Sequence, residues 1–229
     1  MFIPVQDDNP LRSIRFQWVT VLLIAVNAIC FLLESTDRGQ TLAASFAIVP
    51  AELFKVGLFC GSAMGPNDVL AVPESATLLS YMFLHGDILH LISNMLFLWV
   101  FGDNVEDAMG HARYLLFYLA CGVFAALVHA WAMPQSQLPL IGASGAVAGI
   151  VAAYLLLYPN VRVWVLFLRF IPLNITAAVA LGSWILAQLA MILIRDQSQT
   201  AWWAHVGGLV AGAILVLLLR RPGVALFGR

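Results

Sequence analysis

The sequence predicts an all-α integral membrane protein with six transmembrane helices, and two observations carry that prediction. Hydrophobic residues make up 62% of the 229 residues and charged residues only 10%, and the mean hydropathy of +0.93 is far too high for a soluble globular domain. Six separate stretches are apolar enough to cross a hydrocarbon core of roughly 30 Å, which takes about 20 helical residues. They are residues 16–33, 88–101, 114–133, 140–158, 170–194 and 200–219.

The second stretch is the weakest, because it holds His90 and Asn94, and we expect its helix to begin earlier, near Leu78. The first should remain as a helix, since the residues before it lack the basic segment and cleavage site of a signal peptide. The long connection 34–76 contains an amphipathic segment, residues 44–59, that would lie in the outer membrane interface. An ordinary packed loop is an equal alternative for that segment.

The distribution of charge predicts the orientation. Eleven Lys and Arg against twelve Asp and Glu give a net charge of -1, so no basic surface for nucleic acid is expected. Because cytoplasmic loops are enriched in basic residues, the chain is oriented with both termini in the cytoplasm. Eight arginines then lie inside (Arg12, Arg15, Arg113, Arg162, Arg169, Arg220, Arg221, Arg229), against Arg38, Lys55 and Arg195 outside.

No internal repeat, low-complexity tract or linker divides the chain, so residues 1–229 are predicted to form a single domain. It would have a short cytoplasmic N-terminus, residues 1–15, and a helical core from about residue 16 to 220. Cys30, Cys60 and Cys121 stand alone in the sequence, which argues against a structural disulfide or a zinc site.

Polar side chains inside a bilayer are costly and usually mark function, so His90, Asn94, Ser144 and His205 are the candidates. At 1.5 Å per helical residue, His90, Ser144 and His205 each lie roughly 20–27 Å above the charged residues that end their helices. These helices run in the same direction, and the three side chains therefore share one layer. Asn94 lies one turn from His90 on the same helix face.

Small residues would bring Ser144 and His205 together. Gly145 and Gly149 follow Ser144, Gly208 and Gly212 follow His205, and such faces allow helix backbones to approach closely. A serine hydroxyl needs an adjacent base to act as a nucleophile, and His205 is the candidate base. Since no Asp or Glu lies at this depth, the pattern favours a Ser–His dyad over a triad.

Ser144 is also expected to begin its helix inside the membrane, so the first backbone N–H groups would be available to bind an oxyanion. His90 and Asn94 could add side-chain donors from the second helix. Taken singly, these residues have simpler explanations: small-residue runs pack helices, serine often bonds to its own helix, and His90 with Asn94 could make an interhelical hydrogen bond. Four such groups in one layer are hard to explain by packing.

These residues match a family pattern over most of the chain, in order, spacing and helix assignment. The matching segments are MFLHGD (82–87), HLISNMLFLW (90–99), GDNVE (102–106), GASG (142–145) and AHVGG (204–208) with Gly212. On these residues the chain resembles the rhomboid intramembrane serine proteases. The resemblance implies a six-helix rhomboid-like bundle that cleaves transmembrane helices of membrane-protein substrates near their outer ends, without metal or cofactor.

The resemblance also implies roles for individual residues. Ser144 would be the nucleophile and His205 the base, while His90, Asn94 and the Ser144 N–H would form the oxyanion hole. Gly142, Gly145 and His85 would support the site, His85 by orienting its neighbours. Glu106, at the base of the second helix, would be structural.

Two departures from the family pattern matter. Some bacterial rhomboids carry an aromatic residue four positions after the serine, which stacks on the catalytic histidine, whereas this chain has Ala148. Other contacts must then orient His205. The Trp-Arg pair typical of the first loop in some members is also absent, since no tryptophan occurs between Trp18 and Trp99.

The resemblance predicts a bacterial-type enzyme of the cytoplasmic membrane, with lateral substrate access at the fifth helix (170–194) and the loop after it, with Arg195 and Asp196. A catalytically inactive rhomboid-like protein that binds membrane helices is the alternative, but such proteins usually lack the serine or the histidine. A small transporter would place polar groups along a route rather than in one layer. An α/β-hydrolase is excluded, because Ala146 stands where GxSxG needs its second glycine.

Overall fold

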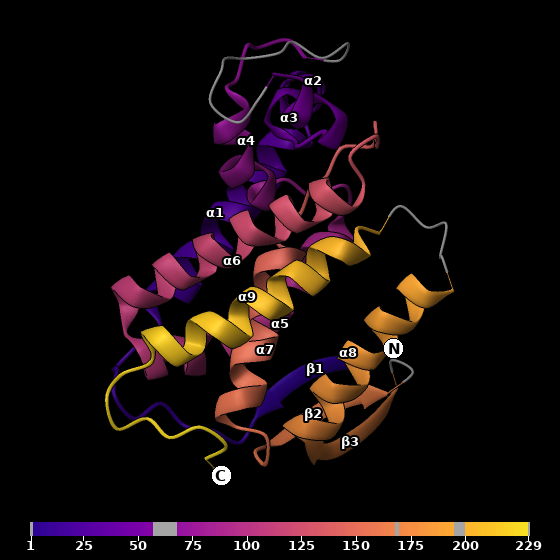
Figure 1. The fold of residues 1–229 in the computed structure, drawn as a ribbon. Helices are drawn as coiled ribbons and strands as arrows, with labels where there is room; N and C mark the ends of the chain where they lie inside the picture. The colour runs from indigo at the N-terminus through magenta and orange to yellow at the C-terminus, as the bar shows by residue number, and fades with distance from the viewer. Residues whose placement is uncertain (1, 57–67, 168–169, 195–199, 229) are drawn as a thin grey trace.

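The computed structural model describes residues 2–56, 68–167, 170–194 and 200–228, which form a helical bundle with a small sheet at one end (Figure 1). The longer helices are α1 (Trp18–Glu34), α5 (Ile88–Met109), α6 (His111–Ala132), α7 (Ser144–Leu157), α8 (Ala177–Leu193) and α9 (Trp202–Leu219). The shorter helical elements are α2 (Asp37–Ala43), η1 (Ala44–Phe46), α3 (Pro50–Val56), α4 (Glu74–Ser80) and η2 (Tyr81–Phe83). The strands are β1 (Phe2–Asp7), β2 (Arg162–Phe167) and β3 (Ile171–Thr176).

The sheet corrects the all-α expectation. In the described residues, the three strands pair antiparallel in the order β1-β2-β3, so the N-terminal residues lie beside the connection between α7 and α8. β2 has the alternation of a half-buried strand, with Val163 and Val165 buried and Trp164 exposed between them. This period-two signal is masked in the sequence because the alternating residues are themselves hydrophobic.

The sheet also shortens the fifth helix. α8 begins at Ala177 rather than at residue 170, because the preceding residues form β3. Thr176 ends that strand and caps the helix, its hydroxyl accepting a hydrogen bond from the Val179 N–H at 3.4 Å.

The sequence predicted that the second helix begins near Leu78, and this prediction is wrong. α4 and η2 occupy that region, and the chain then leaves helical conformation until Asp87 caps α5. The Asp87 carboxylate accepts hydrogen bonds from the N–H groups of Leu89 and His90 at 2.8 and 2.9 Å. α5 ends at Met109, and the next residue is Gly110, whose φ of +85° favours glycine.

All six predicted apolar stretches contain a helix, but not all of these helices are long enough to be counted as spans. Among the described residues, α5, α6 and α9 are long and apolar enough to cross a membrane, and α1 with the sharply bent α2–η1 segment could make a fourth. α7 and α8 are apolar but shorter, at 14 and 17 residues. The six-span count stays a prediction.

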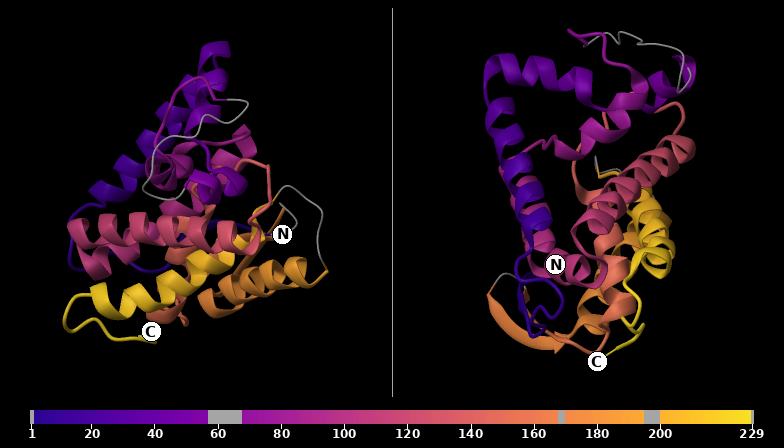
Figure 2. Two further views of the ribbon diagram at one scale, coloured as in Figure 1. Left: turned by 45° about the horizontal axis from the view of Figure 1, so that its top comes forward. Right: turned by 90° about the vertical axis from the view of Figure 1, so that its left-hand side faces the viewer.

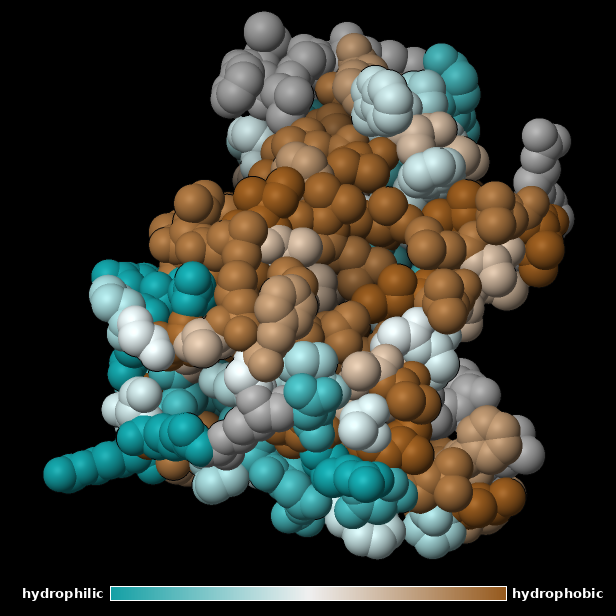
Figure 3. Space-filling model, turned by 60° about the horizontal axis from the view of Figure 1, so that its bottom comes forward, coloured by the Kyte–Doolittle hydropathy of each residue, from teal (hydrophilic) through white to brown (hydrophobic). Residues whose placement is uncertain are grey.

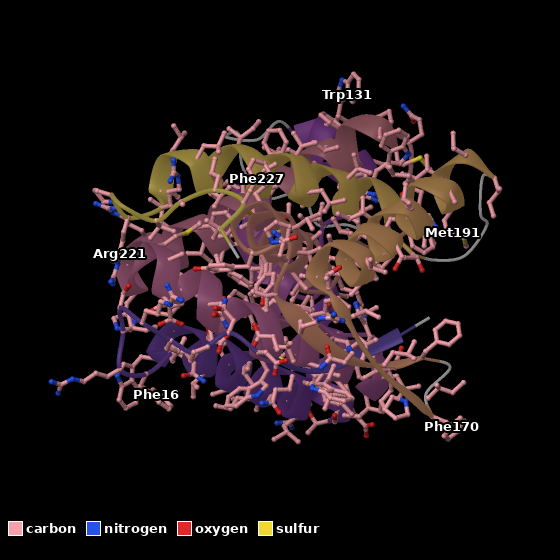
Figure 4. All side chains as sticks on the ribbon, turned by 90° about the horizontal axis from the view of Figure 1, so that it is seen from below. Phe16, Trp131, Phe170, Met191, Arg221 and Phe227 are labelled. Carbon is pink, nitrogen blue, oxygen red and sulfur yellow. The ribbon has the colours of Figure 1, made fainter. Side chains whose placement is uncertain are left out.

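The outer surface of the bundle is suited to lipid. Trp131 of α6 points outward (Figure 4) and is 78% exposed. Figure 3 shows hydrophobic surface covering much of one face, with hydrophilic surface gathered toward one end of the molecule. Exposed large apolar side chains over apolar helices are what an integral membrane protein presents to the bilayer.

α7 lies at the centre of the bundle, against α5, α6 and α9 (Figures 1 and 2). Eleven of its 14 residues are buried, and most of these are Ala, Gly or Val. Small side chains let three helices approach one short helix from different sides. This arrangement places Ser144, the first residue of α7, inside the bundle rather than at its surface.

Two acidic residues at the end of α5 hold the N-terminal region. Glu106 caps α1 by accepting hydrogen bonds from the N–H groups of Val19 and Thr20, at 3.0 and 2.8 Å, and it also contacts His111 Nδ1 at 2.5 Å. The Asp107 carboxylate accepts hydrogen bonds from the backbone N–H groups of three successive residues before α1, which are Arg12, Ser13 and Ile14. Glu106 therefore has the structural contacts that the family resemblance implied.

The described part of the amphipathic segment 44–59 packs against the rest of the chain. Ile48 and Leu53 are buried, and Ile48 exchanges two backbone hydrogen bonds with Leu140, at 3.2 and 2.7 Å. Phe54 is exposed, so an interfacial position for the segment stays a prediction. Cys60, Arg169, Arg195, Asp196 and Arg229 lie outside the described residues, as do residues 57–59.

Candidate active site

Ser144 begins α7, as the sequence predicted. The turn before it depends on Gly142, whose φ of +114° is a conformation that other residues rarely adopt. The Gly142 N–H donates to the Tyr81 carbonyl at 2.9 Å, which anchors the turn. Ser144 itself is half-buried, so its hydroxyl can be reached. As in any helix, the first N–H groups have no intrahelical acceptor.

α7 and α9 contact each other through their glycines. A Cβ on Gly208 would lie 1.9 Å from the Gly145 carbonyl oxygen, and one on Gly212 would lie 2.2 Å from the Gly149 carbonyl oxygen. A Cβ on Gly145 would lie 3.6 Å from the carbonyl oxygen of Ala204. The predicted pairing of the two small-residue faces is therefore confirmed. It sets the start of α7 level with His205, although the hydrogen bonds found among the described residues do not include one between Ser144 and His205.

His205 is buried in the first turn of α9, and α8 holds its ring. The His205 Nδ1 lies 2.8 Å from the Gln188 Oε1 on α8. The ring of Trp184, one turn earlier on α8, lies 6.0 Å from the imidazole with an interplanar angle of 36°. Trp202 meets the same imidazole edge-on at 5.8 Å. These contacts orient the His205 ring, which Ala148 cannot do because it has no aromatic ring to stack on the imidazole.

Gln188 and Trp184 were missed in the sequence analysis. Gln188 did carry a signal, because it is an uncharged polar side chain within the apolar stretch 170–194, and the same argument singled out Asn94. Trp184 carried none, since a tryptophan in an apolar helix is ordinary.

His90 and Asn94 approach the same region from α5. A Cβ on Gly142 would lie 2.6 Å from the His90 Nε2, so the His90 ring packs directly on the turn that precedes Ser144. Asn94 is buried, and its Nδ2 lies 3.1 Å from the His85 Nε2. The rings of His85 and His90 meet edge-on at 5.0 Å. His85 thus contacts both neighbours that it was expected to orient.

A cavity of about 340 Å³ adjoins this cluster. It lies between the end of α1, the α2–η1 segment and the turn before Ser144, and its walls include Glu34, His85, Gly86 and Ile141. The Glu34 Oε2 accepts a hydrogen bond from the His85 N–H at 3.0 Å, which ties the end of α1 to the site.

The Rhomboid domain model matches residues 73–222. This range includes the four candidate residues His90, Asn94, Ser144 and His205. The chain belongs to the rhomboid family. It is 30% identical to the rhomboid protease GluP of Bacillus subtilis (strain 168) over 210 residues, which is 92% of this chain and 36% of that protein. It is 32% identical to RHOMBOID-like protein 5 of Arabidopsis thaliana, over 64% of this chain and 45% of the relative.

The mitochondrial Rhomboid protein 1 of Saccharomyces cerevisiae (strain ATCC 204508 / S288c) is 26% identical over 62% of this chain and 41% of its own length. The chain thus spans between about a third and a half of these curated relatives. Members of the rhomboid family are generally intramembrane serine proteases that act on membrane proteins. Family membership and the apolar helices together support an integral membrane protein.

Proposed function

We propose that this rhomboid is a serine endopeptidase that hydrolyses a peptide bond in or beside a transmembrane segment of a membrane protein, with Ser144 and His205 as its catalytic dyad. The observation that carries the proposal is the glycine contact between α7 and α9, which brings the first turn of α7 against the turn that bears His205. A nucleophile at a helix start and a base on the adjoining helix are the two parts that acyl transfer needs.

The proposed reaction follows from this arrangement. The Ser144 oxygen attacks the scissile carbonyl carbon while His205 Nε2 accepts the hydroxyl proton. The N–H of Ser144, with donors on Asn94 and His90, stabilises the oxyanion. His205 then gives its proton to the leaving amine, and water hydrolyses the acyl-enzyme with His205 again acting as the base. The cavity beside His85 provides a place for water near the site.

The substrate class follows from the same physical reasoning. A transmembrane helix hides each carbonyl in an intrahelical hydrogen bond, so a segment that unwinds easily exposes its scissile bond at the lowest cost. Helix-breaking or small residues near the cleavage site should therefore favour cleavage. We place the enzyme in a bacterial cytoplasmic membrane, as a single domain of residues 1–229 with both termini in the cytoplasm, as the arginine distribution predicts.

The route of the substrate is proposed to run past α8. This helix lies at the edge of the bundle, where its N-terminal end joins the sheet (Figure 1). Its buried residues are Ala177, Ala180, Leu181 and Gln188, and none of the described residues after Gln188 in this helix is buried, so its C-terminal end has little side-chain packing to hold it. A helix that is held less firmly toward one end is suited to move aside for an entering segment.

Labelling with a fluorophosphonate probe tests the dyad. The purified wild-type protein in detergent should form a covalent adduct, whereas Ser144→Ala and His205→Ala should not. Thermal unfolding of each variant shows whether it is folded. If folded wild-type protein gives no adduct, the enzyme proposal is refuted, and a rhomboid-like protein that only binds membrane helices becomes the better account.

A further inference from the structure

The imidazole of His205 has two nitrogens, and the proposed dyad uses only one of them. For Nε2 to accept the Ser144 proton it must be unprotonated, which requires the proton to be on Nδ1. The Gln188 Oε1, 2.8 Å from Nδ1, is a hydrogen-bond acceptor and therefore favours that tautomer. A side-chain amide here meets the requirement that a carboxylate meets in a Ser–His–Asp triad.

The burial pattern of α8 supports a specific role for Gln188. Ala177, Ala180 and Leu181 are buried near the sheet, and beyond them Gln188 is the buried residue among those described in this helix. An amide in an apolar helix costs free energy unless it is hydrogen-bonded. Its described partner is the candidate base itself, so the contact is more than general helix packing.

Trp184 gives the same face of α8 a second contact with His205. It lies one helical turn before Gln188, and its ring centroid lies 6.0 Å from that of the His205 imidazole and 5.8 Å from that of the Phe97 ring of α5. The ring limits the positions open to the imidazole while the amide selects its tautomer. Both constraints come from α8, whereas the nucleophile comes from α7.

We propose that Gln188 is a positioning residue, which accepts a hydrogen bond from His205 Nδ1–H and thereby keeps Nε2 unprotonated and directed toward Ser144. This inference rests on the proposed Ser144–His205 dyad. It adds that His205 can act as a base only while α8 lies against α9. The uncharged Gln188 amide would orient the histidine, as the third carboxylate of a Ser–His–Asp triad does.

The test measures the rate of fluorophosphonate labelling against pH for wild type, Gln188→Met and Gln188→Glu. Methionine has a similar length but cannot replace the amide acceptor, so the labelling rate should fall about 10- to 100-fold, the usual range for an unpaired buried donor. With a cleavable membrane-protein substrate, kcat should fall more than KM rises. Leu186→Met, on an exposed position of the same helix, should label like wild type.

Gln188→Glu keeps an acceptor in the same place and adds a charge. Labelling should return to within about threefold of wild type, and its pH midpoint should move upward, because a neighbouring carboxylate favours the protonated imidazole. His90 on α5 and His129 on α6 are the other described titratable side chains near His205. They are unchanged in every variant, so the shift reports on position 188.

Two results would overturn the inference while leaving the dyad intact. One is a Gln188→Met protein that labels at the wild-type rate. The other, which does not depend on that variant folding, is a Gln188→Glu protein with an unmoved pH midpoint. If wild type itself is unlabelled, the dyad fails first, so the two failures are distinguishable.

Discussion

Replacing Gly208 by alanine should force α9 away from α7 and misalign the site. The added Cβ would lie 1.9 Å from the Gly145 carbonyl oxygen and 2.9 Å from its carbonyl carbon, so these backbone atoms must retreat by about 1.5 Å to reach ordinary contact at 3.4 Å. Overpacking of this kind typically costs about 1–3 kcal/mol of stability. Because Ser144 is bonded to Gly145, it moves with that backbone, and a 1 Å misplacement can cost about 10²-fold in rate.

The assay is fluorophosphonate labelling at one pH together with thermal unfolding in detergent. Gly182→Ala is the matched control, because a Cβ there meets nothing within 4 Å. Gly182 lies inside a helix, so the control should keep full labelling and be stabilised by about 0.4–1 kcal/mol. A Gly208→Ala protein that labels and unfolds like wild type would refute the idea that this contact aligns Ser144 with His205.

Two further predictions concern Asn94 and Asp7. Asn94→Ala should slow labelling of Ser144 by about 10²–10³-fold if its amide binds the oxyanion, and unchanged labelling would remove it from that role. Burial raises the pKa of Asp7 to about 6 from the usual 3.8, so the folded protein holds this proton more tightly than the unfolded chain, and wild-type stability falls as the pH rises from about 4 through 6. Asp7→Asn, which still has an oxygen acceptor for Asn104 and Tyr154, should be more stable than wild type at pH 8 by up to about 3 kcal/mol and equal to it at pH 4. Equal stabilities at both pH values in thermal unfolding would contradict this.

The six longer helices were predictable from the sequence because each coincides with an apolar stretch, but their ends depended on other residues. Thr176 and Asp87 begin α8 and α5 through capping hydrogen bonds, and hydropathy does not show where such caps lie. The sheet was missed for a related reason. β1 pairs with β2 across more than 150 residues, which leaves no local pattern in the sequence. β2 and β3 are close in sequence, but the alternation of β2 is masked because its exposed residue Trp164 is hydrophobic like its buried neighbours.

The candidate site was predictable where its residues are polar side chains in apolar helices, because placing such groups in a bilayer costs free energy and usually serves a function. His90, Asn94, Ser144 and His205 were identified because polar groups in apolar helices need a reason, and the small residues beside Ser144 and His205 predicted the glycine contact that the structure contains. The contact of Gln188 with His205 depends on how α8 is rotated and placed against α9. That placement is set by tertiary packing and could not be obtained from spacing along one helix.

The attachment of α1 to the end of α5 has a consequence for the order of assembly. The hydrogen bonds that Glu106 and Asp107 accept come from residues that were synthesised 86 to 95 positions earlier. At about 5–20 residues per second, the ribosome needs about 4 to 19 s to cover that interval. During this time α1 has no capping carboxylate from α5. α1 therefore acquires its cap only after residue 106 of α5 has been made, and any nascent chain released before that residue lacks the anchor.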